Sequence, residues 1–188
     1  MTMKKRLLLA AGLLSFLGTA QACYDDNQSD KENYINCKQS AEQGHPDAQY
    51  IMGVLYLEGR GQVQDYNRAN EWFLKAAKQG VLIAQHNLGA LYEYGLGVTQ
   101  NYHQAFYWYQ QASQEGLPIA QNSLANMYAR GFGVDQNDKQ AFHWYQKSAE
   151  QGYPRGQNNL GSLYERGQGV IQNDELAIHW YQKAAKQS

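Results

Sequence analysis

Few side chains in this sequence stand in an arrangement that could perform catalysis. The motifs used by common hydrolases and penicillin-recognising enzymes, Gly-x-Ser-x-Gly, His-Glu-x-x-His and Ser-x-x-Lys, are absent. His143 and His179 could suggest a metal pair because they lie 36 residues apart. The residues at the same interval upstream are Tyr107 and Glu71, so we interpret this place as a solvated polar position. We therefore expect a protein that is not an enzyme and holds no metal or cofactor.

A group of polar side chains spaced four residues apart could instead bind a ligand. Asn122, Asn126 and Arg130 would lie about one turn apart on one face of a helix. Two amides and a guanidinium offer several hydrogen-bond donors, which could hold the carboxylate of a peptide. This is binding chemistry rather than catalysis, and it requires a helix that presents the three side chains to solvent.

A repeat of 36 residues supplies such a helix four times, without any insertion. The repeats span 45–80, 81–116, 117–152 and 153–188. Within each repeat, position 4 is small, position 5 is glutamine, positions 8 and 11 are apolar and position 12 is tyrosine. Such spacings place side chains on one face of a helix, here called helix A. The recurring glutamines and tyrosines are Gln49, Gln85, Gln121, Gln157, Tyr56, Tyr92, Tyr128 and Tyr164.

A turn and a second helix, helix B, complete each repeat. Two glycines separated by one residue end helix A, because glycine adopts the left-handed conformation that stops a helix. Small or aromatic residues then recur at positions 25, 28, 29, 32 and 33, the pattern of a helix with one buried face. The expected N-cap residues of helix B are Asp65, Asn101, Asn137 and Asn173. Position 28 is always tryptophan, and we interpret these side chains as core residues: Trp72, Trp108, Trp144 and Trp180.

The combined pattern resembles the Sel1-like repeat family, whose members are related to tetratricopeptide repeats. The segment LGALYEYGLGVTQNYHQAFYWYQQASQEG, which ends at Gly116, is similar to the family consensus. The resemblance covers residues 45–188 and implies an all-α fold, a right-handed superhelical solenoid of helix-turn-helix repeats with a groove lined by helix A. It implies protein binding rather than catalysis. Some cysteine-rich members bind or cleave penicillins, but this chain has no cysteine after Cys37, so a β-lactam hydrolase or peptidoglycan-active protein is a distant alternative.

The first 22 residues have the pattern of a secretory signal peptide. Three basic residues precede an apolar run from Leu7 to Gly18, which is too short to span a bilayer, and Ala20 to Ala22 forms a cleavage site. No other stretch approaches the length of a membrane span, so we expect a periplasmic or secreted protein. Residues 23–188 carry 13 basic and 17 acidic side chains, a net charge of −4, which is typical of a poor nucleic-acid binder.

Cys23 and Cys37 are the only cysteines, and the mature chain would begin at the first of them. In an oxidising compartment a disulfide is expected, which stabilises the fold by about 3 kcal/mol on the loop-entropy estimate. Lipidation of Cys23 is the alternative. Ala20 and Gln21 stand where the lipoprotein pattern has Leu and then Ala or Ser, so the disulfide is favoured.

Segment 23–44 is similar to the second half of a repeat, and we expect it to cap the solenoid. The sequence YINCKQSAEQG aligns with the end of helix B, with Asn36 and Cys37 where tryptophan and tyrosine stand elsewhere. Terminal repeats need a polar outer face for solubility, which this half-repeat would provide. At the other end, the last repeat exposes a face that could form a dimer or another partner contact.

One face of helix A changes from repeat to repeat while the frame stays constant. This face comprises positions 3, 6, 10, 13 and 14, away from the buried stripe. Repeat proteins build extended binding surfaces in this way, although ordinary drift of surface residues would give the same pattern. The candidate groove residues are Tyr50, Glu58, His86, Glu93, Tyr94, Asn122, Asn126, Arg130, Asn158 and Arg166.

Charge and loop residues add to this hypothesis. Charged groove residues are acidic in the first two repeats and basic in the last two, a gradient that would orient a partner of opposite polarity. They are Asp47, Glu58, Glu93, Arg130, Arg155 and Arg166. Leu96 and Phe132 lie at loop tips and could anchor a partner from the rim. We expect an adaptor of the bacterial envelope that binds a protein or peptide; the alternative is an immunity protein or inhibitor of a secreted or periplasmic toxin enzyme.

Overall fold

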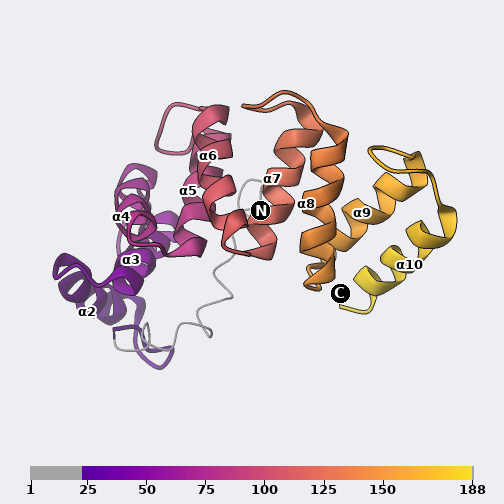
Figure 1. Cartoon of the computed structure of the whole chain (residues 1–188). Helices are drawn as coiled ribbons and strands as arrows, with labels where there is room; N and C mark the ends of the chain where they lie inside the picture. The colour runs from indigo at the N-terminus through magenta and orange to yellow at the C-terminus, as the bar shows by residue number, and fades with distance from the viewer. Residues whose placement is uncertain (1–22, 188) are drawn as a thin grey trace. The chain divides into compact units, whose positions relative to one another are not determined.

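The computed structural model describes residues 23–187, and within this range every regular element is an α-helix (Figure 1). The predicted all-α class is therefore confirmed. None of the described helices is long and apolar enough to cross a bilayer. The predicted signal peptide, residues 1–22, lies outside the described residues. The helices are α2 (Asp30–Glu42), α3 (Pro46–Glu58), α4 (Tyr66–Lys78), α5 (Leu82–Tyr94), α6 (Tyr102–Gln114), α7 (Pro118–Arg130), α8 (Asp138–Glu150), α9 (Pro154–Arg166) and α10 (Asp174–Ala185).

The predicted pair of helices is present in every repeat. Helix A corresponds to α3, α5, α7 and α9, and helix B to α4, α6, α8 and α10. The described residues form two compact units, 23–101 and 102–187, named unit 1 and unit 2. Within each unit, consecutive helices pack against one another, as α7 and α8 do in Figure 1. The architecture is that of an all-α helical repeat solenoid.

The predicted caps and stops are found at the helix ends. The side chains of Asp65, Asn137 and Asn173 each accept a backbone N–H from the first turn of helix B, at 2.9 to 3.1 Å. Helix α7 ends at Gly131, whose φ of 67° is left-handed. The next glycine, Gly133, lies so close to Tyr102 that an added Cβ would come within 2.3 Å of the Tyr102 carbonyl oxygen. One glycine is therefore needed for the turn and the other for packing against the preceding helix B.

The core of the first three repeats centres on the residue after the tryptophan, whereas Tyr181 in the fourth repeat is half-buried. Phe73, Tyr109 and Tyr145 at position 29 are buried, whereas Trp72 and its three counterparts are only half-buried. In three repeats a lysine three residues later covers the indole, and the lysine Nζ lies 3.9 Å from the ring centroid of Trp72. The prediction that the tryptophans are core residues is thus only partly correct. Each indole lies at the edge of the buried stripe, where a lysine stem can cover it.

A buried glutamine joins helix A to the helix before it. The side-chain amide of Gln49 donates to the carbonyl oxygen of Ala41 at 3.3 Å, and Gln121 and Gln157 make the same bond to residues eight positions earlier. The side-chain oxygen of Gln49 accepts from Gln79, just after helix B of the same repeat, at 2.8 Å. Because a buried amide without partners would destabilise the core, these bonds explain why position 5 is glutamine.

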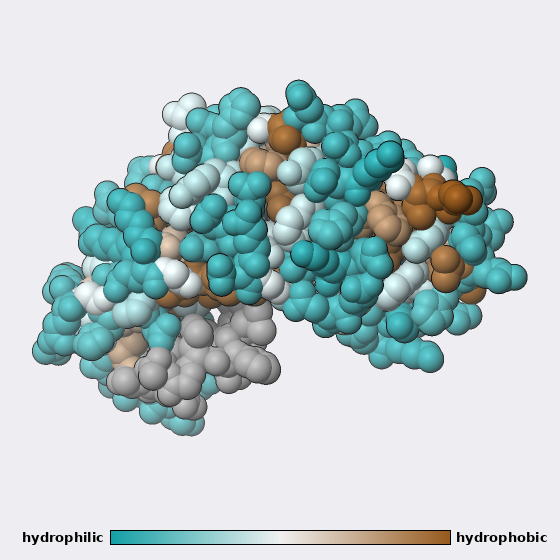
Figure 2. All heavy atoms as spheres, viewed as in Figure 1, coloured by the Kyte–Doolittle hydropathy of each residue, from teal (hydrophilic) through white to brown (hydrophobic). Residues whose placement is uncertain are grey.

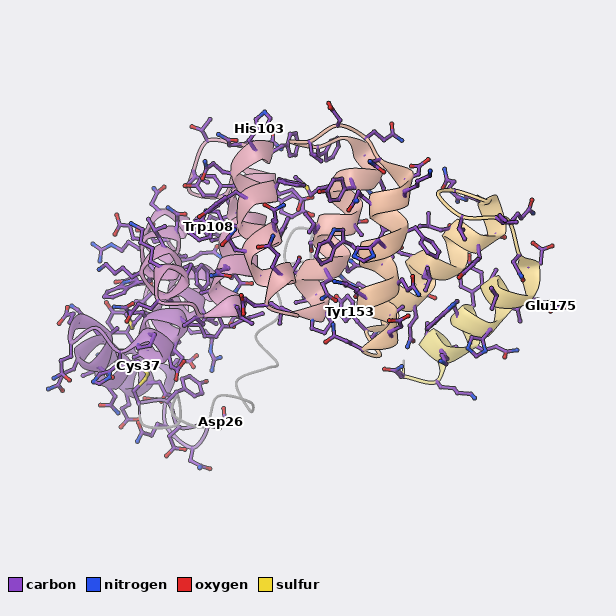
Figure 3. The ribbon with its side chains drawn as sticks, viewed as in Figure 1. Asp26, Cys37, His103, Trp108, Tyr153 and Glu175 are labelled. Atoms are coloured by element: carbon purple, nitrogen blue, oxygen red, sulfur yellow. A yellow bond between two sulfur atoms is a disulfide. The ribbon has the colours of Figure 1, made fainter. Side chains whose placement is uncertain are left out.

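A disulfide and a buried asparagine tie the chain before α2 to that helix. Cys23 is bonded to Cys37, near the Cys37 label in Figure 3. Cys37 is fully buried and takes the place of the aromatic residue at position 29. The buried Asn33 accepts the backbone N–H of Asp25 at 2.8 Å and donates to its carbonyl oxygen at 2.9 Å. The role of segment 23–44 as a solubilising cap stays a prediction.

Candidate partner-binding surface

Three positions of the repeat meet at the edge of helix A in unit 2. They are positions 10 and 14 of helix A and position 29 of helix B. In the third repeat, the Tyr145 hydroxyl donates to Asn126 Oδ1 at 2.6 Å. Arg130 is exposed about one turn further along α7. Because the tyrosine engages the Asn126 oxygen, the amide N–H groups of Asn126 and the guanidinium remain as donors for a partner.

Burial and charge act in opposite directions on the Tyr145 hydroxyl. Burial raises the pKa of Tyr145 to about 12, and the positive charge of Arg130 opposes this shift. The hydroxyl is therefore protonated at neutral pH and can donate to Asn126.

The fourth repeat builds a similar cluster from different side chains. The Tyr181 hydroxyl donates to Glu165 Oε2 at 2.8 Å. Burial raises the pKa of Tyr181 and Glu165 adds to the rise, whereas Ser162 and Arg166 lower it. Ser162 and Arg166 hold positions 10 and 14 of α9. The third and fourth repeats thus both carry a tyrosine at position 29, a small polar side chain at position 10 and an arginine at position 14.

A direct bond between α7 and α9 changes the predicted clamp. Asn159 Nδ2 donates to Asn122 Oδ1 at 2.8 Å, and Asn122 is buried. The clamp requires Asn122 to be exposed beside Asn126 and Arg130, and this part of the prediction was wrong. The physical reason is that position 6 of helix A faces the next helix A rather than solvent. Binding of a carboxylate by Asn126 and Arg130 stays a prediction.

An arginine-rich surface, here called the arginine face, lies on α7 and α9. All of its residues are exposed except Asn126, which is half-buried: Arg130, Arg155, Arg166, Asn126 and Asn158. Arg155 lies in the first turn of α9, close to Tyr153, which Figure 3 labels. Among residues 23–187, none of these arginines has an ion pair with an acidic side chain. The arginine face therefore carries positive charge that the fold does not neutralise.

The same positions differ in unit 1. In the first repeat, positions 10, 14 and 29 hold Val54, Glu58 and Phe73, so the hydroxyl and the arginine are both missing. Tyr50 is 1% exposed and packs against Phe73, with ring centroids 5.9 Å apart. Burial raises the pKa of Tyr50, and the nearby Asn87 of α5 opposes the rise. Tyr50 was predicted to face a groove, but it occupies the packing position that Asn122 holds in unit 2.

His86, a second predicted groove residue, is also buried. Its side chain is 3% exposed, and its Nδ1 lies 3.4 Å from Oδ1 of Asn87. Burial lowers the pKa of His86 to about 4, so the imidazole is neutral at pH 7. The expectation that His86 is presented to a partner is corrected, because position 6 of helix A is a packing position in this repeat as well.

The acidic groove residues of unit 1 are engaged within the fold. Glu58 is half-buried, and burial raises its pKa while Arg60, whose Nη1 is 3.7 Å away, opposes the rise. Arg60 also pairs with Asp30 at 2.9 Å. Glu93 and Tyr94 are half-buried at the end of α5. These residues expose less charge than the arginine face does, and the orientation of a partner by a charge gradient stays a prediction.

The loop residues that were predicted to line a rim are packed against the fold. Phe132 stacks on Tyr102 at the start of α6, with ring centroids 4.5 Å apart and 21° between the planes. The guanidinium of Arg130 lies 5.9 Å from the centroid of the Phe132 ring. Leu96 holds the same loop position in unit 1 and is half-buried. Phe132 is therefore not a free anchor, because its loop folds back onto α6.

Sequence patterns missed three residues of this surface, Tyr145, Tyr181 and Asn159. The tyrosines stand in the buried stripe of helix B, so periodicity assigns them to the core. A chemical signal was available, because phenylalanine replaces them at the same position in the first repeat and a buried tyrosine hydroxyl needs a partner. Asn159 gave no signal, since its partner lies 37 residues away on another helix.

An apolar patch lies on α10 and the loop before it. Ile171, Leu176 and Ile178 are exposed, and Figure 2 shows hydrophobic atoms over the α9 and α10 region. Ile178 stands at position 26, where Phe142 of α8 makes an edge-on contact with Tyr164 of the next helix A. The predicted dimer contact at the last repeat stays a prediction, and this patch is where it would form.

The fold and the arginine face together define a class of protein, an all-α repeat solenoid with a cationic polar surface. The Sel1 repeat profile matches residues 46–81, 82–117, 118–153 and 154–188. The chain therefore belongs to the Sel1 repeat family. Each matched repeat begins one residue later than the sequence spacing predicted.

Solved structures support the same assignment. The chain is 37% identical to c5321, a protective antigen of uropathogenic Escherichia coli with an SLR fold, at a TM-score of 0.79 over 85% of this chain and 34% of c5321. It is 34% identical to a Sel1 repeat protein from Oxalobacter formigenes, at a TM-score of 0.80 over 85% of this chain and 65% of that one. The chain thus spans about a third and somewhat under two thirds of these relatives.

A third structure shares the fold alone. The immunity protein Pa5087 from Pseudomonas aeruginosa is 21% identical, with a TM-score of 0.59 over 100% of this chain and 67% of that one. Proteins of curated function gave no match.

Family membership indicates a general role. Sel1 repeat proteins are generally protein-interaction modules, and the fold is typically a non-catalytic scaffold. Among residues 23–187, no three His, Cys, Asp or Glu side chains are grouped to hold a metal ion. That this chain is not an enzyme and uses no cofactor stays a prediction.

Proposed function

We propose that this protein is a non-enzymatic binding module that recognises a partner protein through the arginine face on α7 and α9. The observation that carries the proposal is the Tyr145 bond to Asn126 beside the exposed Arg130. It holds a polar side chain in one orientation at the edge of a rigid helix pair. Side chains that are ordered before binding lose less conformational entropy when a partner arrives.

Residue types on this surface also favour a protein partner. Arginine is enriched at protein interfaces, where its planar group forms paired hydrogen bonds with carboxylates and carbonyl oxygens. The face joins two helices that Asn122 and Asn159 bond together, so a partner meets a surface of defined spacing.

We place this activity in the periplasm or outside the cell. The disulfide between Cys23 and Cys37 is typical of an oxidising compartment. A disulfide-bonded Cys23 has no thiol left for a lipid, so the same bond favours a protein without a lipid anchor. The intact mass of the mature protein tests for both the disulfide and the lipid anchor, because a lipid adds mass and a disulfide removes two hydrogens.

The first test is a pull-down from envelope and secreted fractions with residues 23–188 as bait. A variant bait carries Asn126→Ala and Arg130→Ala, and a matched control carries Lys139→Ala and Gln140→Ala, an exposed cation and amide on α8. One dominant partner that is lost with the variant and kept by the control would support the proposal. Retention of the same proteins by all three baits would contradict it.

A second candidate is an immunity protein that inhibits a secreted enzyme. The fold likeness to the immunity protein Pa5087 over the whole chain favours it, at 21% identity and as a likeness of fold only. If the captured partner is a secreted enzyme, its activity should fall to background when an equal amount of residues 23–188 is added. Full activity in the saturated complex would leave the adaptor role as the better description.

A further inference from the structure

The charge of the arginine face is unusual for this chain. Residues 23–188 have a net charge of −4, yet Arg130, Arg155 and Arg166 lie together on two helices without an acidic partner among the described residues. Glu165, next to Arg166 in sequence, accepts a hydrogen bond from Tyr181 and keeps its negative charge, so the three arginines outnumber the one carboxylate beside them. The local surface is therefore opposite in sign to the protein as a whole.

Helix stability accounts for two of these arginines but not for the third. Arg130 and Arg166 end their helices, where a cation interacts favourably with the negative end of the helix dipole. Arg155 lies in the first turn of α9, directly after Pro154, where a cation is unfavourable and an acidic residue would be preferred. The first turn of α9 contains no acidic residue. The guanidinium of Arg155 hydrogen-bonds the Tyr153 hydroxyl, which uses only part of its five donors and leaves its charge on the surface.

The spacing of the arginines fits an extended acidic segment. Arg130 and Arg166 both occupy position 14 of their helices, and the bond between Asn122 and Asn159 makes these two helices neighbours. Arg155 lies 11 residues before Arg166 on the same helix, about 16 Å along its axis. An extended chain advances about 3.3 Å per residue, so carboxylates at alternate residues recur about every 7 Å. A segment that lies along α9 can therefore place carboxylates near Arg155 and Arg166, beside the helix that carries Arg130.

We propose that the arginine face binds an acidic, extended segment of the partner protein, with carboxylates on Arg130 and Arg166 and a third on Arg155. The inference rests on the proposed function, because it names the kind of partner that the same surface takes. Asn126 adds amide donors between the first arginine and the segment, since Tyr145 holds its oxygen. Arginine and carboxylate groups form charge-assisted, often paired, hydrogen bonds, which supply both affinity and orientation.

The test measures binding of a fluorescein-labelled peptide of about ten residues in which aspartate alternates with glycine. Fluorescence anisotropy is followed with the mature chain, residues 23–188, at low and at physiological salt. The probes for comparison are the same peptide with asparagine in place of aspartate and a single-stranded DNA of equal charge. The variant is Arg130→Gln with Arg166→Gln, and the matched control is Lys139→Gln with Lys186→Gln, which removes the same charge from exposed sites elsewhere in unit 2.

We expect the acidic peptide to bind at least tenfold more tightly than the asparagine peptide. The arginine variant should weaken this binding at least tenfold, the control less than twofold, and added salt should weaken it in all proteins that bind. Circular dichroism of each variant shows whether it is folded, and Arg155→Gln alone gives a second reading with a smaller loss. Equal binding of the two peptides, equal loss in variant and control, or tighter binding of DNA would overturn the inference.

The same measurements separate this inference from the proposed function. If the pull-down retains a partner that depends on Asn126 and Arg130 while the acidic peptide fails to bind, the surface is a binding site for a different segment. If the pull-down also shows no dependence on these residues, both proposals fail.

Discussion

The first and third repeats share one frame but use it differently. At positions 10, 14 and 29, α3 and α4 of unit 1 carry Val54, Glu58 and Phe73, whereas α7 and α8 of unit 2 carry Asn126, Arg130 and Tyr145. The aromatic ring at position 29 is buried in both. The hydroxyl of Tyr145 contributes to this difference, because it reaches the edge of the core and bonds the polar side chain of Asn126 there.

This comparison shows that the frame and the surface are set by different residues. The ring at position 29 fills the core, and its para substituent decides whether the neighbouring edge is apolar or polar. In unit 1 the bulky Tyr50 fills the space beside Phe73, so the edge is used for packing. In unit 2 the small Asn122 bonds to Asn159 and leaves the edge to Asn126 and Arg130.

The largest effect is expected from removing the buried ring of unit 1. Phe73→Ala should lower the free energy of unfolding by about 3–5 kcal/mol, because it leaves a cavity beside Tyr50 and Gly53. Trp72→Ala should cost clearly less, since that indole is only half-buried. Urea denaturation of residues 23–188 followed by circular dichroism measures both. An equal cost for the two variants would mean that the tryptophan is a core residue after all.

The disulfide is expected to stabilise unit 1 by an amount only slightly smaller. Reduction should lower stability by about 3 kcal/mol, because it releases a loop closed across 14 residues. Thermal unfolding with and without a reducing agent tests this. The double variant Cys23→Ser with Cys37→Ser serves as the control and should not respond to the reductant. A wild type that is equally insensitive would mean that the bond does not form in solution.

His86 should make unit 1 sensitive to mild acid. Its folded pKa of about 4 lies below the value near 6.5 of an unfolded histidine, so the unfolded state binds the proton first. Stability is therefore fully present above about pH 6.5 and falls as the pH decreases toward 4, by about 1.4 kcal/mol for each unit. Between about pH 6.5 and 5 the loss should be about 2 kcal/mol. His86→Gln should flatten this slope, and an unchanged slope would assign the pH dependence to other groups.

The smallest effect on stability, and the most informative for the comparison, is expected from Tyr145→Phe. The variant gives the third repeat the phenylalanine of the first and removes the bond to Asn126, which should cost about 1 kcal/mol of folding free energy. Affinity for the captured partner should fall more than stability does, because the amide loses its fixed orientation. Tyr181→Phe provides the matched change in the fourth repeat. Unchanged partner affinity in both variants would mean that the two hydroxyls play no part in partner recognition.

The helices, their ends and the repeat could be predicted because they depend on residues close in sequence. Alternation of small, aromatic and glycine residues within 36 positions fixes both helices and the turn between them. Burial of Tyr50, His86 and Asn122 could not be predicted in this way. All three stand at position 6. Tyr50 and Asn122 meet residues of the next helix A in the same unit, and a periodicity within one helix carries no information on its neighbour.

Only the part of the candidate surface that depends on spacing within a single helix could be predicted. Arg130, Asn158 and Arg166 are exposed on one face, as their spacing indicated. Phe132 was assigned to a loop tip correctly, but its stacking on Tyr102 depends on a turn that folds back across 30 residues. Contacts of this kind follow from the stacking of repeats rather than from the pattern of one of them.

The glutamine at position 5 has a consequence for how such a chain can be lengthened. Its amide donates to a main-chain oxygen of the preceding helix, and that oxygen belongs to Ala41 in one repeat and to Ser113 or Ala149 in others. A junction made in this way does not depend on the side chain it meets. A 36-residue cassette copied from 117–152 and inserted after Gly152 would bring both halves of the junction with it. The glutamine junction would thus be kept when the number of repeats changes, whereas side-chain contacts such as the bond between Asn122 and Asn159 would not, because Ser123 holds the Asn159 position in the copied cassette.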